Sequence, residues 1–319
     1  MHQTGKDVIG FALQTALGSP ASQPAFAHGL ESGGPGADPS QETDPLTSAH
    51  LAPAGAHRDE IATGAQYVTR AWPKSVGAYL YAVLGDLATT GTGPYEHVIT
   101  LADDDLPYVT VFSDKDGTLY SIADCKLDEL KLSWEGNKPV KLEAKFVGAA
   151  LDKPATFVAT VDETDDPDYF SPLGGTFKMD VDSATPATAR VKSGSLTISR
   201  GAEPHYFSGS VVAGDVTEGG CAPVVDLTLV PEDLSEWEDI VWDDVGEALE
   251  EDVVYGSFEF TFVKGTNELV LAADRVAFVC ELPEADPEGG AAELELTGVC
   301  YRTTDTPVTA TLTNGQATY

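Results

Sequence analysis

Residues 120–148 alternate apolar and polar side chains in two runs that are separated by a turn. The apolar positions are Leu130, Leu132 and Trp134 in the first run, and Val140, Leu142, Ala144 and Phe146 in the second. A repeat of two residues places these side chains on one face of a β-strand, and residues 135–139, EGNKP, are typical of a turn. The pattern therefore predicts a long β-hairpin.

Residues 269–301 repeat this design. An apolar strand is followed by a turn rich in Pro, Asp, Glu and Gly, and then by a strand in which Leu294 and Leu296 alternate with Glu293 and Glu295. A second hairpin is therefore predicted near the end of the chain. A unit that occurs twice is more typical of a building block than of an enzyme.

The similarity between the two halves extends upstream of both hairpins. A predicted strand at residues 67–72 precedes the apolar run at 76–84, and a strand at 222–229 precedes residues 234–249. The last segment has apolar residues at a spacing of three and four with acidic residues between them, which predicts an amphipathic helix. We expect a repeat of whole domains with one helix in each; the alternative is that two unrelated β-rich halves merely look alike.

The first 60 residues differ in composition from the rest. They are rich in Gly, Pro, Ser, Ala and Asp and have little apolar periodicity, which predicts an extended N-terminal arm (1–60) that orders only against a partner subunit. At roughly 150 residues per domain, the 319-residue chain is expected to hold two domains, at 61–192 and 193–319. The predicted fold class is mainly β, with two tandem β-sandwiches, each carrying a short α-helix.

Neither a membrane anchor nor a secretion signal is expected. No run approaches the roughly 18 apolar residues of a membrane helix, and the N-terminus lacks a basic region followed by an apolar stretch.

The net charge is −34, from 52 acidic and 18 basic residues, which argues against a protein that binds phosphate backbones tightly. Nucleic acid could still pass along such a surface as cargo, and simple solubility or adaptation to high salt is the alternative explanation.

The cysteines and histidines show no metal-ligand spacing. Cys125, Cys221, Cys280 and Cys300 are far apart in sequence, and we expect them to pack as small apolar thiols, although Cys280 and Cys300 could face each other across the second hairpin. His97 is expected to be an ordinary strand residue. The acidic segment 162–168 lacks the glycine and the terminal glutamate of a calcium loop, and residues 103–105 are interpreted as a turn. We therefore predict no cofactor, no metal site and no enzymatic activity.

Several segments, taken in order, resemble the major tail tube proteins of long-tailed, siphovirus-type bacteriophages. In the first half these are KSVGAYLYAVLGD at 74–86, GPYEHVIT at 93–100, DLPYVTV at 105–111 and ADCKLDELKLS at 123–133. In the second half they are SGSLTI at 193–198, DVTEG at 215–219 and PVTATLTNG at 307–315. The resemblance covers roughly residues 60–319 and corresponds to the duplicated-domain form of the family.

This resemblance implies a tail-tube-type β-sandwich subunit that forms rings, which stack into a hollow, acidic conduit for DNA ejection. Six sandwiches usually surround the lumen, so a chain with two of them implies a trimer with pseudo-six-fold symmetry, with a true hexamer as the alternative. If each sandwich adds about four strands to an inner barrel, about 24 strands close at a diameter near 50 Å. The family also implies tape measure, tail terminator and distal tail proteins as partners, double-stranded DNA as passing cargo, and a place in the virion after assembly in the host cytoplasm.

Under this hypothesis two sets of residues become candidates. The candidate lumen-lining residues, whose alternative role is an ordinary solvated face, are Glu135, Glu143, Glu293 and Glu295. The candidate hairpin tips that reach other subunits are Gly136, Asn137, Lys138 and Pro139 in the first hairpin, and Pro283, Glu284, Asp286 and Pro287 in the second.

Two functions from other classes compete with this one. A cell-surface adhesin of two β-sandwiches would use residues 162–168 as a calcium-binding loop and would carry a signal peptide. A jelly-roll enzyme acting on carbohydrate would need paired carboxylates beside an aromatic platform, and no such platform stands out in the sequence.

Overall fold

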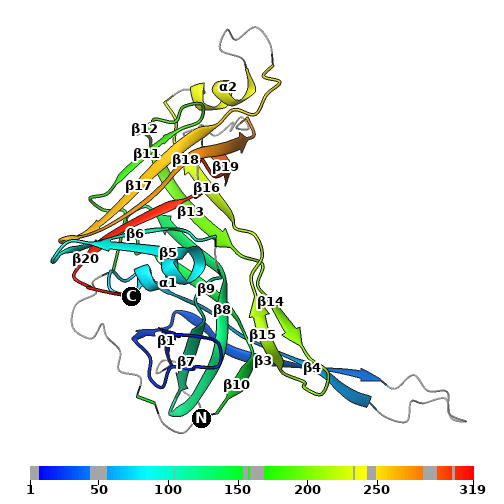
Figure 1. Ribbon diagram of the computed structural model, residues 1–319. Helices are drawn as coiled ribbons and strands as arrows, with labels where there is room; N and C mark the ends of the chain where they lie inside the picture. Colours follow the sequence, from blue (N-terminus) through cyan, green and yellow to red (C-terminus); the bar gives the residue numbers. More distant parts are fainter. Residues whose placement is uncertain are drawn as a thin grey trace, which may run out of the picture.

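The computed structural model describes residues 7–43, 56–103, 105–153, 157–158, 169–232, 234–242, 249–282, 293–303 and 306–319. The protein is mainly β, as predicted, and its strands form one large antiparallel sheet system and a separate two-stranded hairpin. Figure 1 shows a tall body from which one long two-stranded ribbon projects. Among the described residues, no helix is long and apolar enough to cross a membrane.

We call the elements of residues 7–153 the first half. They are β1 (Val8–Leu13), β2 (Phe26–Gly29), β3 (Ser32–Thr43), β4 (Ala56–Arg70), α1 (Val76–Leu84), β5 (Gly85–Thr90), β6 (Tyr95–Leu101), β7 (Val109–Lys115), β8 (Thr118–Glu135), β9 (Lys141–Gly148) and β10 (Ala150–Asp152).

The elements of residues 169–319 form the second half. They are β11 (Thr176–Asp180), β12 (Ala187–Thr188), β13 (Val191–Ser199), β14 (Glu203–Tyr206), β15 (Ala213–Thr217), β16 (Ala222–Leu229), α2 (Ser235–Val241), β17 (Gly256–Lys264), β18 (Asn267–Cys280), β19 (Leu294–Cys300) and β20 (Thr309–Asn314).

Both predicted hairpins are present. β8 pairs with β9, so that Leu132 lies opposite Leu142, and β18 pairs with β19, so that Phe278 lies opposite Gly298. The apolar residues that alternate along these strands are buried, whereas their neighbours are more exposed, which confirms the period of two.

The strand pairings of the first half recur in the second. In the first half the order is β3-β4-β9-β8, and in the second it is β13-β16-β19-β18. The pairs β1–β7, β7–β8 and β8–β10 likewise correspond to β11–β17, β17–β18 and β18–β20. The two sets run from β1 to β10 and from β11 to β20, so they do not coincide with the expected domain limits at 61–192 and 193–319.

Among the described strands, one pair joins the two sets of four strands. β13 pairs with β8, so that Leu196 lies opposite Leu132. The result is a continuous antiparallel run of eight strands in the order β3-β4-β9-β8-β13-β16-β19-β18. A second link between the halves is the pairing of β6 with β20.

One face of the eight-stranded run carries the core. Leu130, Leu132, Leu142, Leu196 and Leu296 are at most 1% exposed. α1 packs within this core, and eight of its nine residues are buried, so this helix is apolar all round rather than amphipathic. Gly85 ends α1 in the left-handed conformation (φ 96°), which glycine adopts without steric cost.

The second helix is shorter than expected. α2 ends at Val241, and Trp242 is already extended, whereas the apolar spacing predicted a helix over 234–249. Glu236 and Glu238 favour the start of α2, but no basic residue in its last turn interacts with the negative end of the helix dipole. Residues 243–248 lie outside the described part of the chain.

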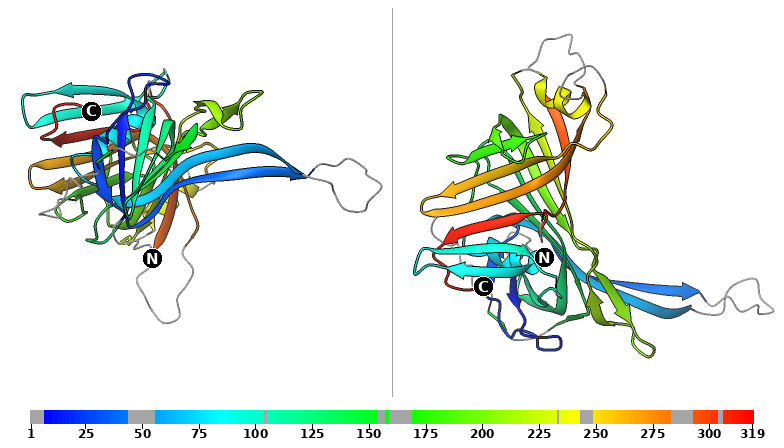
Figure 2. Two further views of the ribbon diagram at one scale, coloured as in Figure 1. Left: turned by 90° about the horizontal axis from the view of Figure 1, so that it is seen from below. Right: turned by 45° about the horizontal axis from the view of Figure 1, so that its top comes forward.

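The N-terminal segment differs from the predicted arm. In β1, Ile9 and Phe11 are fully buried, and the strand pairs with both β2 and β7. Residues 7–29 therefore belong to the body. The prediction was wrong because the many small and polar residues around β1 outweigh its short apolar run in the composition of the segment. The extended part is the ribbon of β3 and β4, which leaves the body in both views of Figure 2.

Candidate assembly surfaces

The eight-stranded run presents a polar face opposite the core, which we call the polar face. Cross-strand pairing brings Lys131 between Glu143 of β9 and Thr197 of β13, and Ser133 between Lys141 and Ser195. Apart from Ser195, which is 7% exposed, these side chains are exposed or half-buried and alternate with the core positions. The polar face is therefore continuous from the first half into the second.

Three of the four candidate lumen-lining residues lie on this polar face. Glu135 belongs to β8, Glu143 to β9 and Glu295 to β19, whereas Glu293 immediately precedes β19. Glu293 forms an ion pair with Lys192. Glu135 forms one with Lys138 at 2.7 Å, and the hydrogen bond from Lys138 lowers the pKa of the Glu135 carboxyl.

The polar face carries basic as well as acidic side chains, although the chain as a whole is strongly acidic. From residue 66 of β4 onward and within β9, β8, β13, β16 and β19, the basic side chains are Arg70, Lys131, Lys141, Lys145 and Lys192, and the acidic side chains are Glu129, Glu135, Glu143, Asp226 and Glu295, with Glu293 paired to Lys192 just before β19. The whole chain has a net charge of −34. The lysines were not among the predicted site residues, although their alternation with Glu143 is visible in the sequence.

The predicted tip of the first hairpin is exposed. Gly136 and Asn137 form the turn, Gly136 has a positive φ of 52°, and Lys138 and Pro139 lead into β9. The predicted tip of the second hairpin, with Pro283, Glu284, Asp286 and Pro287, lies outside the described residues, as does the acidic segment 162–168.

Two strand edges of the eight-stranded run have no partner among the described strands. β3 pairs through one edge with β4 and through its other edge with no described strand. β18 pairs with β17 as far as Val276, and beyond that point residues 277–280 pair, among the described strands, only with β19. Exposed backbone donors and acceptors at a sheet edge are a template for another strand.

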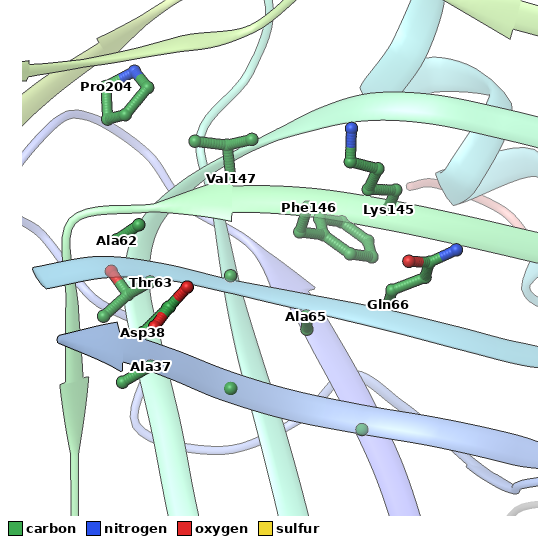
Figure 3. Close-up of a pocket in the computed structure, with 13 residues that line it drawn as sticks. Ala37, Asp38, Ala62, Thr63, Ala65, Gln66, Lys145, Phe146, Val147 and Pro204 are labelled. Carbon is green, nitrogen blue, oxygen red and sulfur yellow. The ribbon is translucent and has the colours of Figure 1, made fainter. Parts of the chain in front are cut away.

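Each open edge has a distinctive surface. At the β18 edge, Val279 is 63% exposed and Leu282 is 51% exposed. At the β3 edge, Gly34, Gly36, Ala37 and Ala62 help to line a hollow of about 550 Å³, which extends to Lys145 and Val147 of β9. Figure 3 shows that β3 and β4 contribute mostly short side chains here, including Ala37, Ala62 and Ala65.

A buried charged cluster links the first half to β15. Lys126 is 1% exposed and lies 3.2 Å from Glu218, with its ammonium group 4.0 Å from the centre of the Tyr108 ring. Lys126 also donates a hydrogen bond to the carbonyl oxygen of Leu106, and Tyr108 donates one to Asp215 at 2.8 Å. Burial, followed by the contact with Asp215, raises the pKa of Tyr108. The Lys126 ammonium is thus paired with a carboxylate from the other half, so the cluster is suited to holding the halves together.

His97 and the groups that could have held a metal ion show no arrangement for catalysis or metal binding in the described part of the chain. His97 is fully buried, with Nδ1 2.9 Å from the hydroxyl of Thr89 and Nε2 2.9 Å from the carbonyl oxygen of Gln316. A carbonyl oxygen can only accept, so the Nε2–H group donates to Gln316. In the described part of the chain, no group of three or more His, Cys, Asp or Glu side chains is placed to hold a metal ion.

The four cysteines are free thiols. The expectation that Cys280 and Cys300 could face each other is wrong, because the register of the hairpin places Cys280 opposite Leu296 and Cys300 opposite Val276. Desolvation raises the pKa of Cys280 to about 11 and that of Cys300 to about 12. Both thiols are therefore protonated at neutral pH.

The sequence matches the model of a known protein family. The family model described as phage tail tube protein matches residues 6–310, which is nearly the whole chain. No curated protein sequence matches it.

Proposed function

Because this chain belongs to the phage tail tube protein family, we propose that its copies polymerise into stacked rings that form the hollow tube of a phage tail. In this role the protein is a structural virion component and needs no catalytic residue. Double-stranded DNA passes through the tube during ejection. The tape measure, tail terminator and distal tail proteins are its partners, and assembly takes place in the host cytoplasm.

The observation that carries this proposal is the run of eight strands that is open at both ends. A chain with one open edge at each end of a sheet can close a ring by head-to-tail pairing. Three copies supply 24 strands, which at a spacing of about 4.8 Å and a tilt of about 40° enclose a barrel about 50 Å across. Six copies would enclose about 100 Å by the same geometry, far more than a duplex needs. We therefore propose a trimer with pseudo-six-fold symmetry, since each chain contributes two sets of four strands.

We assign the polar face to the lumen. The opposite face is covered by the core and by α1, so it is not available to solvent. On the polar face, Glu135 lies beside Lys138 and Glu143 lies opposite Lys131, and no continuous basic track follows the described strands. Phosphate groups are retained by arrays of unpaired cations, because each contact releases condensed counterions. A lining that mixes acidic and basic side chains lets the duplex pass without binding tightly.

Electron microscopy of the purified protein tests the proposal. Negative-stain images are expected to show rings or tubes with a stain-filled centre, and native mass spectrometry is expected to show a ring of about 101 kDa, three times the chain mass of 33.6 kDa. Dispersed monomers at high concentration would overturn the tube assignment. A ring of six chains would preserve the tube but replace the trimer.

A further inference from the structure

We propose that the open end of β18 pairs with the open edge of β3 in the next copy, with Val279 opposite Gly34. This inference rests on the proposed function and adds to it the partner strands and their register. It follows from the internal pair β8–β13, which already joins two equivalent sets of strands within one chain.

The two edge strands of the run, β18 and β3, are equivalent to the two strands of that internal pair, β8 and β13. β8 pairs with β9 and β10 along one edge and with β7 and then β13 along the other. β18 pairs with β19 and β20 along one edge and with β17 along the other. No described strand occupies the place on this second edge that corresponds to β13. β3 is the counterpart of β13, because each is the first strand of its set.

The register follows from the shared pairings. In the first half, Ser32 lies opposite Val68, Val68 opposite Glu143, and Glu143 opposite Lys131, so these four residues form one row across the strands. Asp226 of β16 connects Ser195, Thr297 and Val279 in the matching row of the second half. Val68 lies three residues before Ala71, whose backbone N–H donates to the carbonyl oxygen of Val140 just after β4, and Asp226 lies three residues before Leu229, which lies opposite Leu294. Val279 is therefore equivalent to Lys131, and Ser32 to Ser195.

Transferring the internal contacts gives the contacts between copies. Lys131 lies opposite Thr197 and Ser133 lies opposite Ser195. By equivalence, Val279 lies opposite Gly34 of the next copy, and Glu281 lies opposite Ser32. Pro35 has no backbone N–H to donate and is the kind of residue found in edge strands, which agrees with β3 being an edge until a second copy arrives.

The surfaces at the two edges complement each other in shape. Val279 projects from the polar face and is 63% exposed, which is unusual for an apolar residue in a strand. Gly36 has no side chain and no atom within 4 Å of the position that a Cβ would take, so it leaves room beside β3 in the hollow of about 550 Å³, while the end of the Lys115 side chain lies beside Gly34. Insertion of Val279 into this hollow removes apolar surface from water on both copies.

Leu282 gives a second, independent indication of the same partner. Its equivalent in the first half is Trp134, which crosses from β8 into the second half and packs against Phe260 and Phe262 of β17, with ring centroids 5.5 and 5.3 Å away. Leu282 lies at the corresponding place two residues beyond the end of β18, but it is 51% exposed. It lacks in the isolated chain the neighbouring core that Trp134 has.

Cysteine cross-linking tests the register. In a Cys280→Ser background, Ser32→Cys combined with Glu281→Cys is expected to form disulfides on mild oxidation and to give covalent dimers and trimers on non-reducing gels. The matched control, Ser32→Cys with Ala277→Cys, places the second thiol four residues away along β18 and is expected to remain monomeric on the same gels. Cross-linking of the control pair in place of the first would overturn the register.

A substitution tests the edge without cysteines. Val279→Asp is expected to leave the fold intact by circular dichroism and to abolish rings at concentrations where the parent forms them. Val253→Asp, at a valine that is 62% exposed, is the control and is expected to leave rings intact. Rings of Val279→Asp, together with no cross-linking of the Ser32→Cys, Glu281→Cys variant, would overturn this inference while the tube function stands. Monomers of the parent protein would overturn both.

Discussion

The indole ring of Trp134 lies 5.3 Å from the ring of Phe262, although Trp134 belongs to the first half of the chain and Phe262 to the second. Trp134 is 4% exposed and also contacts Phe177 and Phe260. Trp134 lies on β8, and the backbone of β8 pairs with that of β13 in the second half. The two halves therefore share one sheet and one core, and they are expected to unfold together.

The first prediction concerns this shared core. Trp134→Ala is expected to lower the free energy of unfolding by about 3–5 kcal/mol, because a large buried ring is replaced by a cavity. Urea denaturation followed by circular dichroism measures the change. Trp242→Ala, at a tryptophan that is 37% exposed, is the matched control and is expected to cost much less. Equal losses for the two variants would contradict the role given to Trp134.

The second prediction concerns the buried ion pair of Lys126 and Glu218. Glu218→Ala leaves the Lys126 ammonium buried without its carboxylate, which is expected to cost about 3–5 kcal/mol of unfolding free energy. Glu232→Ala removes the partner of Arg190 in an ion pair whose side chains are 65% and 70% exposed, and it is expected to cost less than about 1 kcal/mol. The Lys126→Met, Glu218→Leu double variant is expected to recover much of the loss in the same urea titration.

These two contacts show how far the sequence alone leads. The period of two along residues 130–146 predicts the hairpin and its buried face, because alternation fixes which side chains enter the core. Nothing local relates Lys126 to Glu218, in the other half of the chain, or β8 to β13. The pattern of residues predicts where the strands are but not which distant strands pair, because that pairing depends on the whole sheet.

The same reasoning explains the predictions that failed. The strand β1 is only six residues long and lies in a segment rich in small and polar residues, so composition predicts an arm where two core residues, Ile9 and Phe11, are buried. The apolar spacing at residues 234–249 predicts one helix, yet the backbone leaves the helix at Trp242. The net charge of the chain also gives no sign that Lys131, Lys141 and Lys145 gather on the polar face.

The third prediction concerns thiol reactivity. Since desolvation raises the pKa of Cys280 to about 11, its reaction with iodoacetamide in the folded protein is expected to be slow at pH 8 and to accelerate as the pH approaches 11. Burial favours the neutral thiols of Cys280 and Cys300, so their contribution to stability changes only above the unfolded pKa of about 8.5, and it is lost as the pH rises toward the folded values of about 11 and about 12. Mass spectrometry of peptides alkylated at each pH measures the rates. Rapid alkylation of folded Cys280 at pH 8 would contradict the burial of this thiol.

The fourth prediction tests the assignment of the polar face to the lumen. Tubes that carry Glu129→Lys, Glu143→Lys and Glu295→Lys together are expected to bind short DNA duplexes at low salt and to release them as salt increases, because three anions on the lining become cations. The parent tubes are expected to bind little. Protection of the bound duplex from nuclease distinguishes the lumen from the outer surface.

The control for this experiment places the same charges elsewhere. Glu203→Lys, Glu232→Lys and Glu251→Lys change three exposed acidic residues outside the eight-stranded run. Any duplex that these tubes bind is expected to remain sensitive to nuclease. Protection by the control tubes, and not by the first variant, would place the polar face on the outside.

The last prediction concerns the ribbon of β3 and β4. Its distal part is exposed, contributes nothing to the core, and projects away from the eight-stranded run (Figure 2). Ring closure through β3 uses residues 32–36, near the body, so the distal part is free to contact the next ring. Replacing residues 42–57 with Asn-Gly keeps the cross-strand pair of Gln41 and Arg58 beside a turn suited to a hairpin. The shortened protein is expected to form single rings but no tubes in negative-stain images, with an unfolding midpoint close to that of the parent. Full-length tubes from this variant would show that stacking depends on another surface, and loss of the rings themselves would show that the distal ribbon takes part in closure.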